Sequence, residues 1–451
     1  MTRVVMVGAG GMTFGLALAT DLLTEPMLQG AELVLYDPDL SRAERTARAA
    51  QAVAGARHQP LDLKVTDHRR SALRAADYVL LTFQIGGLEA YRTDLDIPRR
   101  FGVDCVAGDT LNPGGVMRFV RSSAVFEALA QDMQDLCPDA LVLNYTNPMA
   151  MNTLYLAQLG LRVVGLCHSI PGTAAVIARL LGLAPQTLTY RAAGINHQAW
   201  FLTLEAAGVD QRHRLRAALR EQFLPAYGGA TPWTEGEGTY AGGQERVRAE
   251  LMETFGHFTS ESSHHASEYV PYFRRSPEAV KAHLPRRWDY LRTAQAMQGQ
   301  EAGLIGASVR QLSHDPRPSG EGAMPLIAAL EGGEQTELYV NVRNDGWITN
   351  LPAEACVEVP AQVDRRGIRP QQIGRLPAAC AGLNLTGIAL QTTAVEAVAA
   401  RDPEGLLAAF ALDPLTASLL DLGSIRAMAH ELFQAQRSWL PGWLRPAVGQ
   451  R

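Results

Sequence analysis

Cysteine and charged residues are both scarce in this sequence. Its 451 residues include only 5 cysteines, and Asp, Glu, Lys and Arg together account for 19%. The cysteines are odd in number and widely spaced, which argues against a disulfide framework and favours a reducing, cytoplasmic compartment. The formal net charge of -5 and the scattered basic residues give no footprint for nucleic acid, so no nucleic-acid partner is predicted.

Long apolar runs are missing as well. No stretch approaches about 18 uninterrupted apolar residues, so the sequence predicts no membrane span. The first residues run directly into a strand and lack the charged, apolar and small-residue sections of a secretory signal. Hydrophobic residues make up 47% of the chain, which is ordinary for a globular protein, and the length suffices for two domains.

The first part of the chain alternates strands with helices. The apolar segments that predict buried strands are residues 3–7, 32–36, 63–66, 78–83, 141–144 and 163–167. Because helical stretches separate them, they predict right-handed βαβ units and a parallel sheet. We therefore predict an α/β fold, with an N-terminal doubly wound, Rossmann-like domain over residues 1–190. A mixed α+β domain over residues 191–451 would complete the site and carry the oligomer contacts.

The second part of the chain has a mixed pattern. We predict strands over 199–205, 337–342 and 355–360, and helices over 246–255, 277–298, 393–400, 403–412 and 414–435. Residues 227–243 contain six glycines and predict a flexible loop that covers a substrate.

The turn after the first strand has the composition of a nucleotide-binding turn. It contains Gly8 and Gly10 and leads into a helix, which places backbone N–H groups where a pyrophosphate can rest. The sixth position of the usual fingerprint is Thr13 rather than glycine. Asp37 ends the second strand, where an acid holds a ribose diol and disfavours a 2′-phosphate. We predict NAD, with Phe83 after a later strand as a further contact.

Polar residues follow several of the other strands. Cys167 and His168 end one predicted strand, Asn147 follows the strand before it, and His197 lies in a polar loop farther along. Since open α/β sheets bind ligands at the carboxyl ends of their strands, these loops should converge. Cys167 and His197 could share a metal or could both be structural. Two protein ligands would suit a catalytic ion whose open positions take substrate oxygens.

Three further segments have two interpretations each. Residues 108–115, which include Asp109, and residues 341–346, which include Asn344, predict either plain turns or contacts to a hydroxyl-rich ligand. The pair His264 and His265 predicts either metal ligation or a solvated helix start, and the helix start is favoured.

The combination of these motifs resembles glycoside hydrolase family 4 and, within it, the melibiase-type α-galactosidases. The matching strings occur in order almost from end to end, which makes chance agreement remote. They are FQIGG (83–87), GDT (108–110), PGGVMR (113–118), NYTNPMAMN (144–152), GLCHS (165–169), AGINH (193–197), ESS (261–263), NVRNDG (341–346) and WLPGWL (439–444).

The resemblance implies roles for individual residues. Cys167 and His197 would be the ligands of a divalent metal, usually manganese. His168 would be the general acid. The base would be Glu261, with Tyr269 as the alternative.

The resemblance also implies a reaction and a substrate. It implies hydrolysis of terminal α-galactosides by a redox-neutral cycle of oxidation, elimination, addition and reduction with bound NAD. The implied substrate contacts are Asn147, Asp109, Arg118 and Asn344.

Other specificities and another reaction stay open. They are α-glucosidase, α-glucuronidase or phosphoglycosidase activity, and an NAD-dependent dehydrogenase of a hydroxy acid or sugar. A phosphoglycosidase would need a cationic pocket, for which the pairs 274–275 and 286–287, all arginine, are the candidates. A homodimer or homotetramer is expected.

Overall fold

One mixed sheet runs through the whole molecule. The computed structural model describes residues 1–11, 14–224, 244–284, 286–315 and 317–445, so Thr13 and the glycine-rich segment 227–243 lie outside the described residues. Within this part of the chain the strand order is β3-β2-β1-β4-β5-β6-β10-β11-β7-β8-β9, and β12 pairs with β11. The strands are β1 (Arg3–Val7), β2 (Glu32–Tyr36), β3 (Asp62–Thr66), β4 (Tyr78–Leu81), β5 (Leu141–Asn144), β6 (Arg162–Leu166), β7 (Leu188–Ile195), β8 (Gln198–Ala206), β9 (Val209–Asp210), β10 (Thr336–Arg343), β11 (Cys356–Asp364) and β12 (Gly367–Pro370).

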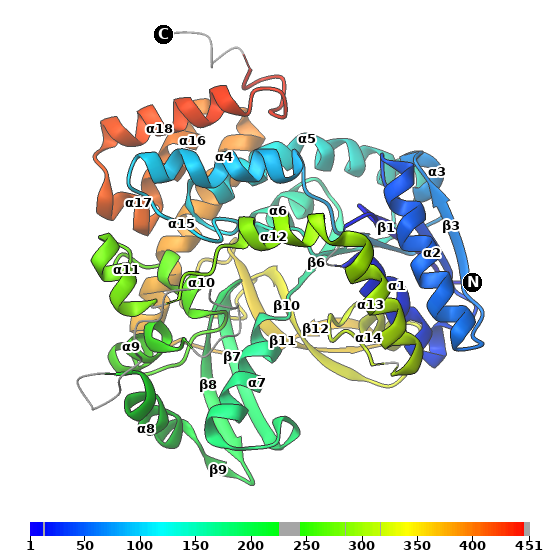
Figure 1. Cartoon of the computed structure of the whole chain (residues 1–451), viewed down its shortest axis with the longest axis horizontal. Helices are drawn as coiled ribbons and strands as arrows, with labels where there is room; N and C mark the ends of the chain where they lie inside the picture. The colour runs from blue at the N-terminus through cyan, green and yellow to red at the C-terminus, as the bar shows by residue number, and fades with distance from the viewer. Residues whose placement is uncertain (12–13, 225–243, 285, 316, 446–451) are drawn as a thin grey trace.

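The first six strands form the predicted doubly wound parallel sheet (Figure 1). Apolar side chains of β1 alternate between its two faces: Val5 and Val7 enter one core cluster, and Val4 and Met6 enter another. This period of two buries the strand on both sides, as a sheet covered by helices on both faces requires. The helices of this half are α1 (Gly15–Asp21), α2 (Leu40–Ala56), α3 (Arg69–Leu73), α4 (Gly87–Arg100), α5 (Asn112–Leu136), α6 (Met149–Gln158) and α7 (Ser169–Leu181), with short 3₁₀ turns at Leu22–Thr24, Pro26–Leu28 and Pro185–Thr187.

The strand order reverses between β1 and β4, which creates the crevice where such sheets bind ligands. Gly8 directly follows β1, and Phe83 follows β4. Gly8 has φ +88°, and a Cβ at this position would lie 2.6 Å from the Phe83 Cβ. Glycine is therefore required for the two loops to approach each other at the crevice.

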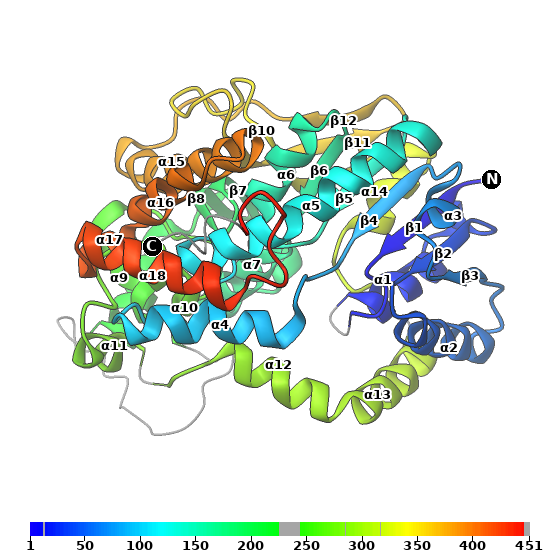
Figure 2. The ribbon, with the colours of Figure 1, turned by 90° about the horizontal axis from the view of Figure 1, so that it is seen from above.

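The antiparallel strands of the second half extend the same sheet beyond β6. The division near residue 190 stays a prediction, because the sheet is continuous across it. Figure 2 shows α12 and α13 running along one side of the molecule, from α4 to α2. The helices of this half are α8 (Arg212–Phe223), α9 (Arg246–Phe255), α10 (Ser263–Glu268), α11 (Pro277–His283), α12 (Tyr290–Gly299), α13 (Glu301–His314), α14 (Ala323–Leu330), α15 (Ala378–Ala400), α16 (Pro403–Leu412), α17 (Pro414–Leu419) and α18 (Leu422–Ala435).

Two predicted helices are each divided in the structure. The prediction over 277–298 is wrong between α11 and α12, because α11 ends just before a proline and Asp289 caps a new helix by accepting from the Arg292 N–H at 3.3 Å. The prediction over 414–435 is wrong between α17 and α18, where Asp421 accepts from the Ser424 N–H at 2.7 Å.

Among the described residues one helix, α15, is long and apolar enough by length and composition to cross a membrane, and half of its most apolar stretch is buried within the protein. It packs against α16, α6, α5 and β7, and its polar residues Asn384 and Gln391 are buried. These contacts are those of a core helix.

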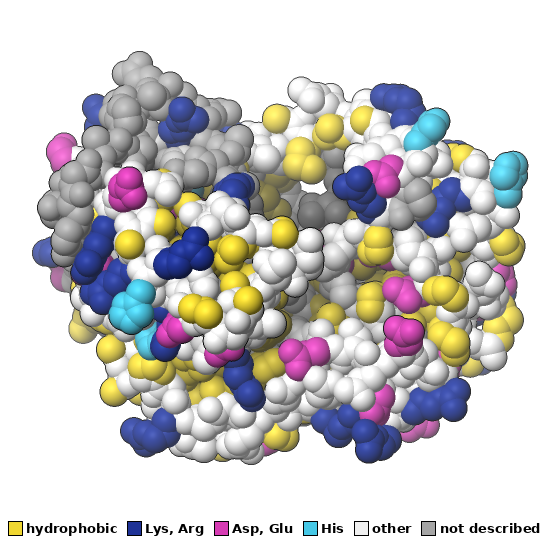
Figure 3. All heavy atoms as spheres, turned by 90° about the horizontal axis from the view of Figure 1, so that it is seen from below, with side chains coloured by type: hydrophobic (Ala, Val, Ile, Leu, Met, Phe, Trp, Pro, Cys, Tyr) yellow, Lys and Arg dark blue, Asp and Glu magenta, His cyan; other side chains and the backbone are white. Residues whose placement is uncertain are grey.

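Basic and acidic side chains are interspersed on the face drawn in Figure 3, which is hollowed near its upper centre.

Asp413, the N-cap of α17, should make stability depend on pH. It is fully buried, and burial raises its pKa from 3.8 to about 6, although Thr416 and Asn112 donate to it. Because the folded pKa lies above the unfolded one, its stabilising contribution is complete below about pH 4 and is lost as the pH rises through 6, by about 3 kcal/mol. We expect the melting temperature of the wild type to fall relative to Asp413→Asn between pH 4 and pH 7. If the melting temperatures of the two proteins changed equally with pH, the prediction would be contradicted.

Candidate active site

The loops after β5 and β6 carry the predicted polar residues. Asn147 lies between β5 and α6, while Cys167 and His168 lie between β6 and α7. All five cysteines are free; four are buried, as expected of small apolar side chains, and Cys167 is partly exposed. The Glu261 carboxylate acts electrostatically on Cys167, His168 and His197. The charge of Glu261 therefore acts both on the loop after β6 and on the β7–β8 turn that carries His197.

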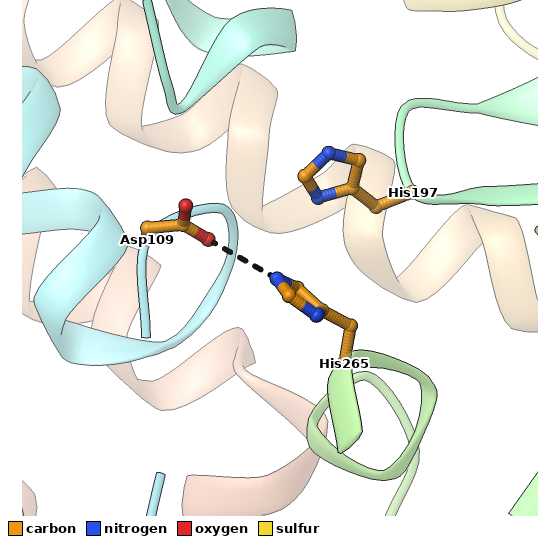
Figure 4. A group of neighbouring side chains, drawn as sticks. All are labelled: Asp109, His197 and His265. Atoms are coloured by element: carbon orange, nitrogen blue, oxygen red, sulfur yellow. Dashed lines mark ion pairs between the residues drawn. The ribbon is translucent and has the colours of Figure 1, made fainter. Parts of the chain in front are cut away.

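Asp109, His197 and His265 form a group able to hold a metal ion. Each offers one ligand atom, and these atoms lie within 4.8 Å of one another in a buried place. Figure 4 shows the three side chains pointing toward one another from the loop before α5, the β7–β8 turn and α10. The His265 Nε2 lies 3.9 Å from Asp109 Oδ1. The group contains His197, one of the two predicted metal ligands, but not Cys167.

Hydrogen bonds fix the orientation of the His197 ring. Thr110 donates its hydroxyl proton to Asp109 Oδ1 at 3.0 Å, and its oxygen lies 2.9 Å from His197 Nδ1. The Tyr269 hydroxyl lies 3.2 Å from the same Nδ1, so two hydroxyls orient the ring. Figure 4 shows this nitrogen facing Asp109 and His265.

His265 comes from α10, where the favoured sequence interpretation is wrong. His264 and His265 are only 2% and 5% exposed, so this segment is not a solvated helix start. Ser262 caps the helix by accepting from the His265 N–H at 3.3 Å, and its hydroxyl lies 3.1 Å from His265 Nδ1. Trp288 packs against both imidazole rings, with a centroid distance of 5.9 Å to each.

The protonation states of Asp109 and His197 favour metal binding, whereas that of Cys167 opposes it. Burial opposes ionisation of Asp109, but the charges of His265 and Arg118 outweigh it, and its pKa lies below the usual range. Burial lowers the pKa of His197, which favours the neutral imidazole that a metal requires. Burial, followed by the charges of Glu358 and Glu261, raises the pKa of the Cys167 thiol well above its usual range. An ion at Cys167 would therefore have to displace a proton.

The two candidate bases are placed differently. Tyr269 is buried, its hydroxyl lies 3.2 Å from His197 Nδ1, and burial raises its pKa well above 10. Glu261 has φ +72°, a conformation that is strained for a glutamate. His197 is also left-handed, with φ +65°. His197 takes this conformation in the two-residue turn between β7 and β8, where a positive φ is usual, so the strain argument applies to Glu261.

Two of the predicted substrate residues have buried polar atoms without a hydrogen-bond partner among the described residues. They are Asn147 Oδ1 and Arg118 Nη1. Their other atoms are engaged: Asn147 donates to Asp109 Oδ2 at 3.0 Å, and Arg118 donates to Gln84 Oε1 at 2.6 Å. Because buried polar groups are normally satisfied, the two unpaired atoms fit a hydroxyl-rich ligand beside Asp109.

Asn344 has a different environment from these residues. Its amide nitrogen donates to the carbonyl oxygens of Ile348, Leu351 and Pro352 at 3.0 Å each, and its Oδ1 accepts from the Ile348 N–H at 2.8 Å. These bonds shape the loop after β10. The hydrogen bonds of Asn344 therefore have a structural role in this loop. Its predicted contact to substrate stays a prediction.

The nucleotide turn has the acid in the predicted place. Asp37 Oδ2 accepts from the Gly10 N–H and Oδ1 accepts from the Asp39 N–H, both at 3.0 Å. A Cβ at Gly10 would lie 2.9 Å from that carboxylate, so glycine allows the close approach. Each carboxylate oxygen keeps a second lone pair that can accept from a ribose hydroxyl, which fits NAD.

His168 is the exposed member of the site, with 48% of its side chain accessible. Its Nδ1 lies 3.3 Å from Glu321 Oε2, and this hydrogen bond raises the pKa of His168 despite partial burial. Cys167 and Glu321 both line a cavity of about 330 Å³, together with Tyr190, Tyr339 and other residues. The candidate acid therefore adjoins a space large enough for a small ligand.

One arginine of each pair named as a possible phosphate pocket is engaged with protein partners. Arg274 is buried and donates to Ser267 Oγ and to the Asp104 carbonyl oxygen. Arg287 donates to both carboxylate oxygens of Asp104, at 2.7 and 2.8 Å. Structural ion pairing thus accounts for the two guanidinium groups.

Two family models together match most of the chain. Residues 3–183 match "Family 4 glycosyl hydrolase", and residues 192–416 match "Family 4 glycosyl hydrolase C-terminal domain". An alpha-galactosidase of Bacillus subtilis (strain 168) is 33% identical over 98% of this chain and 99% of the relative. An alpha-galactosidase of Rhizobium meliloti (strain 1021) is 32% identical over 97% and 89%. An alpha-galacturonidase of Bacillus subtilis is 29% identical over 92% and 93%.

Solved structures show the same fold. A 6-phospho-alpha-glucosidase from gut microorganisms in complex with NAD and Mn²⁺ has a TM-score of 0.78 and 22% identity, over 98% of this chain and 99% of that one. The 6-phospho-beta glucosidase of Thermotoga maritima with manganese, NAD⁺ and glucose-6-phosphate has a TM-score of 0.77 and 20% identity, over 97% and 99%. With matches that cover both halves and relatives above 30% identity, the chain belongs to glycosyl hydrolase family 4.

Proposed function

We propose that this family 4 glycosidase is an α-galactosidase that requires NAD and a divalent metal, with manganese the favoured ion. The observation that carries the proposal is the buried Asp109–His197–His265 group, which lies beside unpaired hydrogen-bonding atoms of Asn147 and Arg118. A metal donor set next to free sugar-binding atoms suits a hydroxyl-rich substrate held on an ion. The choice of galactose is supported by the two alpha-galactosidases with 32% and 33% identity.

The residues of the site would divide the work as follows. When bound, NAD supplies a hydride acceptor and donor for a ring carbon, and the divalent ion supplies Lewis-acid polarisation of the sugar oxygens. Cys167 and His197 would hold the ion, with Asp109 and His265 as further donors around His197. The Gly8–Gly10 turn, Phe83 and Asp37 would hold the nucleotide in the β1–β4 crevice.

Proton transfers fall to two other side chains. Glu261 would remove the proton from C2, which becomes acidic once the adjacent carbon is oxidised. His168 would protonate the leaving oxygen. Its hydrogen bond to Glu321 raises its pKa, which favours the protonated form that an acid needs. Asn147 and Arg118 would orient the sugar through their unpaired atoms, and Tyr269 would support the His197 ring.

A neutral substrate is supported by the charges around the site. Arg274 and Arg287 are engaged with protein partners, as described above. The cavity beside His168 is lined by Glu321 and Glu337, and no Lys or Arg is among the described residues that line it. Arg191 lies nearby, but it donates to the Gln372 carbonyl oxygen at 2.8 Å. A phosphorylated sugar would meet negative charge at this cavity.

One observation favours a second candidate, α-galacturonidase activity. The buried, unpaired Nη1 of Arg118 could pair with a sugar carboxylate, because guanidinium groups bind carboxylates well. Asp109 already lies within the electrostatic reach of Arg118, which reduces its pull on a second anion.

The decisive assay is hydrolysis of an aryl α-galactoside beside the galacturono, gluco and glucurono analogues. It should contain NAD, Mn²⁺ and a thiol reductant, with each omitted in turn. We expect the galactoside to be cleaved fastest, without lasting accumulation of NADH. Omission of NAD or of the metal should slow cleavage by at least about 10³-fold. Net NADH production without release of aryl alcohol would identify a dehydrogenase and refute the proposal.

A further inference from the structure

A single buried carboxylate holds the loop that presents Asp109. The side chain of Glu268 is 0% exposed. Its Oε1 accepts from the N–H groups of Val106 and Ala107 at 2.6 and 3.0 Å, and its Oε2 accepts from the Gly108 N–H at 3.0 Å. Its main-chain carbonyl oxygen accepts from Asn112 Nδ2 at 3.1 Å. Glu268 therefore fastens both ends of the segment 106–112.

That segment carries the acidic side of the candidate metal group. Asp109 lies one residue after the three fastened N–H groups, and Thr110 follows with its hydrogen bonds to Asp109 and His197. The same short helix that carries Glu268 also carries His265, and Tyr269 comes next. Glu268 thus links the loop that carries Asp109 to the helix that carries His265.

The charge of Glu268 is needed for this geometry. Three consecutive N–H groups converge on its two oxygens, and a buried carboxylate is tolerated only with such donors or a cation. The Arg274 Nη2 lies 3.8 Å from Oε1 and supplies the cation, while Ser267 and the Asp104 carbonyl hold the guanidinium. Glutamine could accept at one oxygen only, and its NH₂ group would face an N–H group without an acceptor.

We infer that Glu268 is a positioning residue that fixes the loop of residues 106–112 so that Asp109 and Thr110 face His197 and His265. This inference rests on the proposed function, because it assigns to that geometry the task of holding the metal. Glu268 is not among the candidate metal donors, and its carboxylate is occupied by main-chain N–H groups. Its effect passes through the main chain of Val106, Ala107 and Gly108.

The test measures Mn²⁺ binding by electron paramagnetic resonance in Glu268→Gln, Glu268→Asp and the wild type, without substrate. We expect Glu268→Gln to weaken Mn²⁺ binding by about 10- to 100-fold, as when partners of metal ligands are removed. Glu268→Asp keeps the charge with a shorter reach and should be intermediate. Hydrogen exchange at the amides of residues 106–108 should accelerate in the same order.

The matched control is Glu253→Gln on α9. Glu253 also accepts several hydrogen bonds, from Arg216 and Arg220, but it lies outside the Asp109 loop. It should leave Mn²⁺ affinity unchanged. NAD affinity, which depends on the turn at Gly8, should be unchanged in all variants.

Two results would overturn the inference. One is a Glu268→Gln protein that melts like the wild type and binds Mn²⁺ equally well. The other is a parallel loss of Mn²⁺ affinity, NAD affinity and melting temperature in both Glu268 variants, which would show a general loss of structure. A wild type that binds Mn²⁺ but cleaves no α-galactoside would contradict only the proposed function, since the metal-binding comparison needs no turnover.

Discussion

Replacing His197 with alanine is expected to reduce kcat/KM by at least about 10³-fold and to abolish high-affinity Mn²⁺ binding. His197 is common to both possible ligand sets, the predicted pair with Cys167 and the observed group with Asp109 and His265. Its removal also leaves the Thr110 and Tyr269 hydroxyls without their shared partner. The measurements are steady-state hydrolysis of an aryl α-galactoside and titration with Mn²⁺.

Two companion variants separate the ligand sets. Cys167→Ser should abolish activity and leave NAD binding largely intact, whereas His265→Ala should weaken Mn²⁺ binding with a smaller effect if Cys167 supplies the stronger ligand. Wild-type protein stripped of metal with a chelator should be inactive and should recover on addition of Mn²⁺. Full activity after exhaustive removal of metal would exclude the metal role of all these residues.

Replacing Glu261 with glutamine is expected to lower kcat by about 10²- to 10⁴-fold, the usual contribution of a general base. The amide keeps the size of the side chain and loses its basicity. During turnover in D₂O, the wild type should incorporate deuterium at C2 of the released galactose. Glu261→Gln should lose this exchange together with activity, while metal and NAD binding persist.

Tyr269→Phe is the matched control for the base. It removes the hydroxyl that lies 3.2 Å from His197 Nδ1, and we expect weaker metal binding with C2 exchange still coupled to turnover. If Tyr269→Phe instead stopped exchange and Glu261→Gln did not, Tyr269 would be the base. Loss of neither exchange nor activity in both variants would refute abstraction at C2 by these side chains.

Much of the fold could be predicted from sequence periodicity. β1, β2, α9 and α16 have the predicted bounds, because their apolar patterns are regular and their ends carry clear signals. The divided helices were missed because a proline after Leu284 and the caps at Asp289 and Asp421 interrupt continuous helical patterns. Local signals at those points outweigh propensity.

The candidate site was predictable only in part. Cys167, His168 and Asn147 follow parallel strands, so topology alone places them at one edge. His265 and Glu268 come from a short helix far along the chain, and their approach to Asp109 depends on tertiary packing that periodicity does not encode. The only sequence signal there was the density of titratable groups around residues 261–269. The cytoplasmic location and the homo-oligomer stay predictions.

The pairing of β6 with β10 has a consequence for how ligands enter. Val340 and Asn341 of β10 are in register with Leu166 and Gly165, just before Cys167. Strand pairing thus joins the parallel and antiparallel parts of the sheet next to Cys167. Rotation of the two halves of the sheet relative to each other would break this pairing, so we expect a ligand to enter without such a rotation.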